Sequence, residues 1–141
     1  MPAEHPRGLL DTNIVILRRW IDPDDLPAEV AISAVTLAEL SAGVHLVRGA
    51  DSATERARRI DVLQRVEHEF DPIPFDVDAA RAFGRISAAV QAVGRTPRRR
   101  IADLMIAAVA AAQSLPLYTT NPRDFVGLDE LLEVEAVSRP D

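Results

Sequence analysis

Acidic side chains next to apolar segments are the residues of this chain best suited to chemistry. Asp11 ends the apolar run 8–10, and Asp103 is the one charge in the apolar segment 101–112. Carboxylates gathered at one place repel one another unless one is protonated or a cation joins them. Hard oxygen ligands suit Mg²⁺ or Mn²⁺ better than zinc. A cluster built from these acids would therefore bind one or two divalent ions for phosphoryl chemistry.

The composition excludes several other kinds of site. The 141 residues include no Cys, which excludes disulfides, thiolate zinc sites and a cysteine nucleophile. They include no Lys either, which excludes the P-loop lysine and Schiff-base chemistry. The net charge of −6 disfavours non-specific binding to nucleic acid. Any contact with nucleic acid must then come from local clusters of Arg, which supplies all 16 basic residues.

Strands and helices alternate along the chain, and these elements must position the acids. The pattern predicts strands at 8–10, 30–32, 72–75, 115–119 and 134–137, and helices at 13–20, 36–47, 53–70, 77–93 and 101–112. This order predicts an α/β fold, with a parallel β-sheet flanked by α-helices. We expect residues 1–141 to form a single domain. The strand at 72–75 is expected at an edge, because its prolines cannot donate to a neighbour.

The predicted topology brings the acids together. Ligands of open parallel sheets bind outside the carboxyl ends of the strands. Asp11 lies at such an end, and Asn121 and Asp124 follow the strand at 115–119. Glu39 is expected in the first turn of the helix after the second strand. Asp103 opens the helix that leads into the strand at 115–119. All these side chains are therefore expected at one edge of the sheet.

Each acid also has a purely structural interpretation. Asp11 would cap the helix that follows it, and Asp124 would lie in an exposed turn. Glu39 would be the partner of Thr36 in a capping box, because the two are three positions apart. Asp103 is the hardest to explain in this way, since an acid that opens an apolar helix lies near the interior and needs a partner.

Four motifs resemble those of PIN-domain ribonucleases, in particular the VapC toxins of bacterial toxin–antitoxin pairs. The motifs are, in order, Leu9-Leu10-Asp11-Thr12-Asn13, then Ser33, Thr36, Glu39-Leu40 and Gly43, then 102–108, then Thr119, Asn121, Arg123, Asp124 and Phe125. The resemblance covers about residues 8–125. Four motifs in the family's order, in a chain of this size, are a specific signal.

The resemblance implies a parallel sheet with an acidic pocket for Mg²⁺ or Mn²⁺, and an endoribonuclease that hydrolyses RNA such as tRNA or rRNA. It implies that Asp11, Glu39 and Asp103 are the catalytic residues and metal ligands. Further ligands would be Asn121 or Asp124. The residues that would orient the carboxylates are Thr12, Asn13, Ser33, Thr36 and Thr119. Many PIN domains have an acid where this chain has Asn121, so the fourth ligand stays open.

Partners follow from the resemblance and from two local features. We expect Arg98, Arg99 and Arg100 to bind RNA phosphates, because they directly precede Asp103. The helix at 13–20 is apolar and ends at Trp20, which favours a groove for another chain. VapC toxins are held inactive by a VapB antitoxin, so we expect such an antitoxin and a toxin homodimer. No apolar run is long enough to cross a membrane, and we expect a cytoplasmic protein.

Two other functions compete with this interpretation. Receiver domains and Mg²⁺-dependent phosphatases also hold the ion at the carboxyl edge of a parallel sheet, but both normally need a Lys, and this chain has none. A catalytically weak PIN-like fold would serve only as a binding module. The intact acids at Asp11, Glu39 and Asp103 argue against that function, while Asn121 leaves it open.

Overall fold

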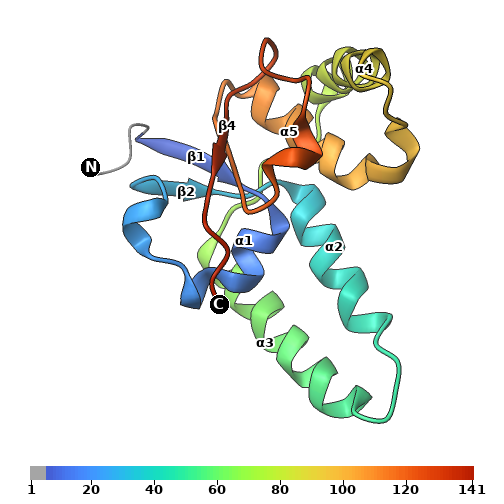
Figure 1. The fold of residues 1–141 in the computed structure, drawn as a ribbon. Helices are drawn as coiled ribbons and strands as arrows, with labels where there is room; N and C mark the ends of the chain where they lie inside the picture. The colour runs from blue at the N-terminus through green and yellow to red at the C-terminus, as the bar shows by residue number, and fades with distance from the viewer. Residues whose placement is uncertain (1–5) are drawn as a thin grey trace.

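A parallel sheet of four strands forms the centre of the computed structural model, which describes residues 6–141 (Figure 1). The strands lie in the order β2-β1-β3-β4, and all three pairings are parallel. Their bounds are Arg7–Leu10 for β1, Glu29–Ala31 for β2, Leu117–Thr119 for β3 and Val134–Ala136 for β4. The predicted α/β fold with a parallel sheet is confirmed.

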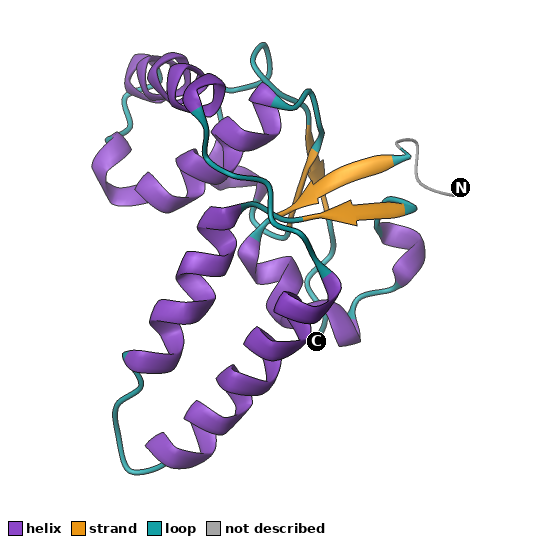
Figure 2. Ribbon diagram, turned by 180° about the vertical axis from the view of Figure 1, so that it is seen from behind, coloured by secondary structure: helices purple, strands orange, loops and turns teal. Residues whose placement is uncertain are grey.

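Helices cover both faces of this sheet. They are α1 (Thr12–Leu17), α2 (Ala34–His45), α3 (Ser52–Glu69), α4 (Val77–Ala92) and α5 (Ile101–Ala112). Short 3₁₀ turns occupy Arg18–Trp20, Pro23–Asp25, Pro97–Arg100 and Pro122–Phe125. Helices α2 and α3 form a long hairpin that projects from the body of the molecule (Figure 2). None of the helices within residues 6–141 is long and apolar enough to span a membrane.

Alternation along the central strands divides the core in two. Successive side chains of a strand point to opposite faces of the sheet. Leu9 and Leu117 accordingly pack with the buried residues of α4 and α5, whereas Leu10 and Tyr118 pack with those of α1 and α3. The two strands that carry the candidate site are thus buried on both faces, which holds their carboxyl ends rigidly.

Helix α5 lies deep in the molecule, as its apolar sequence predicts. Six of its 12 residues are buried, three of them alanines. These small side chains allow a close approach to α4, the helix with which α5 makes its most extensive contact. Asp103, in the first turn of α5, is therefore carried by one of the most firmly packed elements of the fold.

Two predictions about local structure are wrong. Residues 72–75 form no strand: Ile73 makes only an isolated parallel bridge to Ser33, because the prolines on either side of Ile73 have no N–H to extend the pairing. The capping box of Thr36 and Glu39 is also absent. Ser33 is the N-cap of α2, and its Oγ accepts the hydrogen bond of the Thr36 amide at 3.2 Å.

Candidate active site

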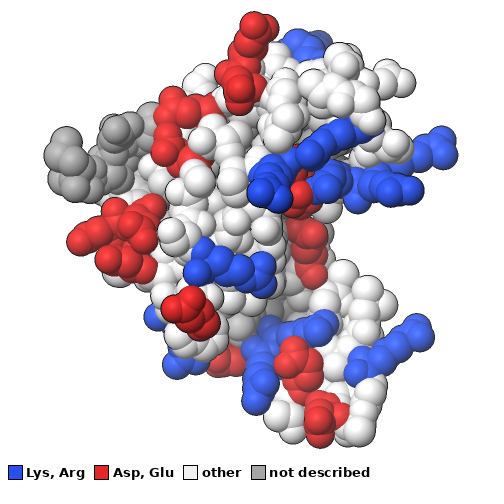
Figure 3. Space-filling model, viewed as in Figure 1, with Lys and Arg blue, Asp and Glu red and all other residues white. Residues whose placement is uncertain are grey.

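Asp11, Glu39 and Asp103 line one cavity of about 630 Å³. Asp11 follows β1, Glu39 lies in α2 and Asp103 lies in α5, so three elements that are distant in sequence meet there. Thr12 and Asn13 line the same cavity. In Figure 3, acidic side chains are recessed in a hollow between the sheet and the α2–α3 hairpin, with basic side chains above and below. The expected gathering of acids at the carboxyl edge of the sheet is what the structure shows.

Asp11 is held by hydrogen bonds on both carboxylate oxygens. Its Oδ1 accepts from the Thr12 amide at 2.8 Å, which caps α1, and its Oδ2 accepts from the Thr119 hydroxyl at 2.8 Å. The side chain is only 4% exposed. The Asn121 amide in turn donates to Thr119 Oγ1 at 3.0 Å, which fixes that hydroxyl. Asp11 thus combines the two alternatives that its position in the sequence suggested: it caps a helix and faces the acidic cavity.

A pair of threonine hydroxyls fixes Glu39. Thr12 Oγ1 donates to Glu39 Oε1 at 2.6 Å and lies 3.0 Å from Thr36 Oγ1. A hydroxyl has one hydrogen, and that of Thr12 is used on the carboxylate, so Thr36 donates to Thr12. Thr36 is fully buried, so water is not available as another acceptor for its hydroxyl. The acid of α2 is thereby tied to the residue that follows Asp11.

The acids raise one another's pKa. Burial, followed by the charges of Asp11, Asp124 and Glu39, raises the pKa of Asp103 to about 6, with Arg100 opposing the rise. Burial also raises the pKa of Asp11, and its hydrogen bonds to Thr119 and Thr12 oppose this effect. At Asp11 and Asp103, therefore, burial and repulsion between acids outweigh the groups that favour the ionised form.

Asp124 is paired with Arg100. The Arg100 guanidinium donates to Asp124 Oδ1, and the Asp124 side chain is 27% exposed rather than lying in an open turn. Arg98 and Arg99, by contrast, are exposed on the 3₁₀ turn before α5. The three arginines that the sequence groups together are therefore in different surroundings.

Ser33 and Asn121, like Thr36, Thr119 and Asp124, do not line the cavity. Ser33 is fully buried as the cap of α2. Asn121 precedes the 3₁₀ turn Pro122–Phe125 and contacts the site through its backbone amide. Of the predicted acids, Asp11, Glu39 and Asp103 line the cavity, and Asp124 is near enough to raise the pKa of Asp11 and Asp103.

The donor set fits a hard divalent cation. Within residues 6–141, no three Asp, Glu or His side chains are gathered closely enough to enclose a metal ion. Mg²⁺, however, is bound through one or two carboxylates and keeps several waters. Asp11 and Asp103 meet that requirement, and a cation would relieve the repulsion that raises their pKa values.

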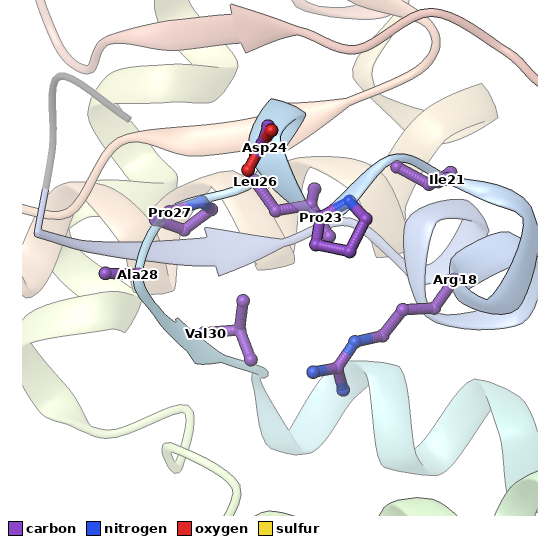
Figure 4. Close-up of a pocket in the computed structure, with 8 residues that line it drawn as sticks. All are labelled: Arg18, Ile21, Pro23, Asp24, Leu26, Pro27, Ala28 and Val30. Carbon is purple, nitrogen blue, oxygen red and sulfur yellow. The ribbon is translucent and has the colours of Figure 1, made fainter. Parts of the chain in front are cut away.

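A second cavity, of about 470 Å³, lies at the β2 edge of the sheet (Figure 4). Arg18 points across it toward Val30, and its other walls include Leu26 and Pro27. The Arg18 guanidinium already pairs with Glu69. None of the predicted site residues lines this cavity, so the acids distinguish the first cavity as the candidate active site.

Comparison with known proteins agrees with this geometry. Residues 9–131 match the PIN domain. The chain is 40% identical over 133 residues to ribonuclease VapC5 of Mycobacterium tuberculosis, covering 92% of this chain and 93% of that protein. The chain belongs to the VapC family of PIN-domain ribonucleases. A further VapC relative, ribonuclease VapC8 of the same species, is 38% identical over 73% of this chain and 89% of its own length.

The VapC fold is also matched by a solved structure. The crystal structure of VapBC-5, a member of the VapBC family of toxin–antitoxin systems from Mycobacterium tuberculosis, superposes with a TM-score of 0.77 at 38% identity. The match covers 95% of this chain and 99% of the other. PIN-domain VapC ribonucleases in general depend on a divalent metal ion, in agreement with the acidic cavity.

Sequence reasoning missed the contribution of α3 to this VapC cavity. Glu55, Arg58, Arg59 and Val62 of α3 form part of the wall, although the sequence predicted a solvent-facing helix there. The hairpin is held by Arg59, whose guanidinium donates to the Gly43 carbonyl at 2.8 Å. Gly43 belongs to the second VapC-like motif, and it was the one signal that another element packs closely against α2.

Proposed function

We propose that this VapC protein is the toxin of a toxin–antitoxin pair and hydrolyses phosphodiester bonds of cytoplasmic RNA such as tRNA or rRNA with Mg²⁺ or Mn²⁺. The observation that carries the proposal is the convergence of Asp11, Glu39 and Asp103 on one cavity. We assign the whole chain, residues 1–141, to a single domain with this activity.

Asp11 and Asp103 would bind the ion, with Glu39 as a third acid that acts directly or through a water. When bound, the divalent ion lowers the pKa of a water and offsets charge on the phosphate. Hydrogen bonds hold these carboxylates in fixed orientations. The Thr119 hydroxyl and the Thr12 amide orient Asp11, and the Thr12 hydroxyl orients Glu39. Water adds to phosphorus and the bond to the 3′ oxygen breaks, which leaves a 5′-phosphate and a 3′-hydroxyl.

RNA would approach through the exposed arginines before α5. Arg98 and Arg99 are exposed, and the turn that carries them leads directly into the helix of Asp103. Guanidinium groups bind phosphates in a bidentate manner, which suits an acidic protein that must hold RNA locally. Arg100 would instead hold the loop of Asp124 beside the acids.

A VapB-type antitoxin would inhibit the toxin by covering the cavity. Ile14 and Val15 are buried in the core, so the expected apolar groove along α1 is reduced to Ile16 and Trp20, which are 44% and 61% exposed. A segment lying over Ile16 would reach the acids, and a basic side chain on it would compete with the metal ion. The structural relative VapBC-5 belongs to a toxin–antitoxin family, which supports this partner. We also expect the toxin to form a homodimer in the complex.

Purified protein incubated with total RNA tests the proposed activity. We expect discrete cleavage products with Mg²⁺ and none with EDTA, and the products should carry 5′-phosphates that a 5′-phosphate-dependent exonuclease recognises. The Asp11→Asn variant is the matched control for a contaminating nuclease. Equal cleavage by the variant, or cleavage that persists in EDTA, would contradict the proposal.

A further inference from the structure

The wall of the active-site cavity also contains an exposed aromatic ring and an exposed cation. Trp20 and Arg58 line the same cavity as Asp11, Glu39 and Asp103. The Trp20 side chain is 61% exposed although it is the largest apolar side chain of the protein. The Arg19 guanidinium carbon lies 5.2 Å from the centre of its ring, which adds a second cation beside it.

Arg58 is the arginine of this wall that is available to a ligand. Its pair with Glu55 is long, at 3.9 Å, and its side chain is 76% exposed, so the pair is weak. The neighbouring Arg59 is already used, because it donates to Glu55 at 3.0 Å and to the Gly43 carbonyl at 2.8 Å. The α2–α3 hairpin thus fixes Arg59 and leaves Arg58 at the cavity mouth.

We propose that Trp20 and Arg58 bind one unpaired nucleotide of the RNA next to the cleaved phosphate, with its base stacked on the indole and its phosphate on the guanidinium. This inference rests on the proposed function and adds two residues, outside the acids, that would hold the RNA. Single-stranded nucleic acid is bound by this combination of an aromatic face and a positive groove. Paired bases of an A-form helix are not available for such stacking.

The size and charge of the cavity suit a short single strand of RNA. Its volume of about 630 Å³ is that of a small-ligand site, which suits one or two nucleotides and not a duplex. Basic side chains lie above and below the recessed acids in Figure 3. The exposed arginines near the cavity include Arg98 and Arg99 on the turn before α5 and Arg58 on α3. A strand that crosses the acids would therefore meet a guanidinium before and after the cleaved bond.

Trp20 is the only Trp of the chain, so its fluorescence reports this contact directly. A short single-stranded RNA is titrated into the protein in EDTA, where metal-dependent hydrolysis does not occur. We expect the RNA to quench Trp20 fluorescence, and the same sequence in a duplex to quench it much less. Binding of the RNA without quenching would overturn the stacking assignment.

A matched pair of variants tests the phosphate contact. Arg58→Ala should weaken RNA binding about 5- to 10-fold and lower the slope of log affinity against log salt by about 0.7, the value for one phosphate contact on a single strand. Arg81→Ala is the control, since Arg81 has a similar pair with Asp78 at 3.7 Å and 71% exposure on α4, outside the cavity wall. Equal effects of the two variants would contradict a site at Arg58.

The ring is tested with labelled RNA. Trp20→Leu should weaken binding by about 5- to 100-fold, as for the loss of one base–aromatic stack, and Trp20→Phe should restore most of it. Cleavage of total RNA with Mg²⁺ is measured in parallel. Cleavage by wild type without quenching would contradict only this nucleotide site, whereas quenching without cleavage would contradict only the proposed ribonuclease. Quenching by the antitoxin but not by RNA would assign Trp20 to the protein partner and overturn the proposal.

Discussion

Asp11 and Asp103 face the same cavity, but the groups around them stabilise their ionised forms to different extents. Burial raises the pKa of both acids, but Asp11 accepts two hydrogen bonds that favour its ionised form, whereas at Asp103 only Arg100 opposes the rise. Asp11 also caps α1, so its side chain contributes to the fold. Substitution should therefore cost the fold more stability at Asp11 than at Asp103.

Asp103→Asn should abolish RNA cleavage and leave the fold intact. The variant loses a metal ligand, and it also loses a charge that burial and neighbouring acids oppose, so its stability should be unchanged or higher at neutral pH. Cleavage assays at saturating Mg²⁺, with circular dichroism for the fold, measure both effects. Wild-type activity in this variant would remove Asp103 from the site.

The pKa of Asp103 predicts how stability changes with pH. Because this pKa rises from 3.8 to about 6 on folding, the folded protein binds more protons than the unfolded chain between those values. The free energy of unfolding should therefore fall as pH rises from about 4 to above 6, by on the order of 2 kcal/mol from this group. Urea denaturation at pH 5 and pH 7.5 in EDTA measures the difference, and Asp103→Asn should remove most of it. An equal difference in the variant would contradict the assignment to Asp103.

Thr12 should act through Glu39 and not through the fold. Thr12→Val removes the hydroxyl that donates to Glu39 at 2.6 Å, and we expect activity or metal affinity to fall about 10- to 100-fold. Thr12→Ser keeps the donor and should retain most of the activity. The Mg²⁺ dependence of cleavage distinguishes the two variants, and equal losses in both would show that only the methyl group matters.

At the scale of elements, the arginines of the 3₁₀ turn before α5 have two expected roles, RNA binding and support of the Asp124 loop. Arg98→Ala with Arg99→Ala should weaken RNA affinity and flatten its salt dependence, because both side chains are exposed. Arg100→Ala should instead release the Asp124 loop and raise the pKa of Asp103 further, since Arg100 opposes that rise. Filter binding across a salt series measures the first effect. An unchanged affinity and slope in the double variant would show that Arg98 and Arg99 are only solvated charges.

The elements that the sequence predicted well are those with a strong local pattern. The apolar runs of β1 and α5 are enough to predict a buried strand and a buried helix. A parallel sheet then places Asp11 and Asp103 at one edge. The partner of Glu39 was not predictable in this way, because Thr12 lies 27 positions away and their contact depends on how α2 packs against α1. The strand expected at 72–75 does not form, because proline lacks the backbone N–H that pairing with a neighbouring strand needs, however apolar the segment is.

The role of α3 was hidden for a related reason. Its wall residues Arg58 and Val62 lie one turn apart on a helix that is otherwise charged, which is also the pattern of a solvent-facing helix. Only the packing of the hairpin, fixed by Arg56 and Arg59 on the last carbonyls of α2, turns that face toward the acids.

At the scale of the whole molecule, an acidic toxin must separate the charge that binds metal from the charge that binds RNA. The net charge is −6, yet the acids of the site are recessed and the arginines around them are exposed. A partner that covers the cavity would therefore block the metal and the RNA together. One binding event would be enough for full inhibition.

Expression alone and together with the neighbouring reading frame tests this inhibition. We expect the protein alone to arrest growth, and the neighbour to copurify with it and restore growth. Asp103→Asn with no neighbour is the control that separates toxicity from the burden of expression. A wild-type protein that is harmless alone and copurifies with nothing would contradict the toxin role, even with the fold unchanged.

The double role of Asp11 has a consequence for how such a gene decays. Substitutions of Asp11 other than Asp11→Asn remove the cap of α1 together with the activity, and the destabilised product is more open to proteolysis. A mutation of Asp103 to Asn removes the activity alone. Survivors of unopposed expression would therefore include folded, long-lived Asp103 alleles that still bind the antitoxin. Such alleles would sequester antitoxin from any intact copy of the toxin in the same cell, so they would be dominant and not silent.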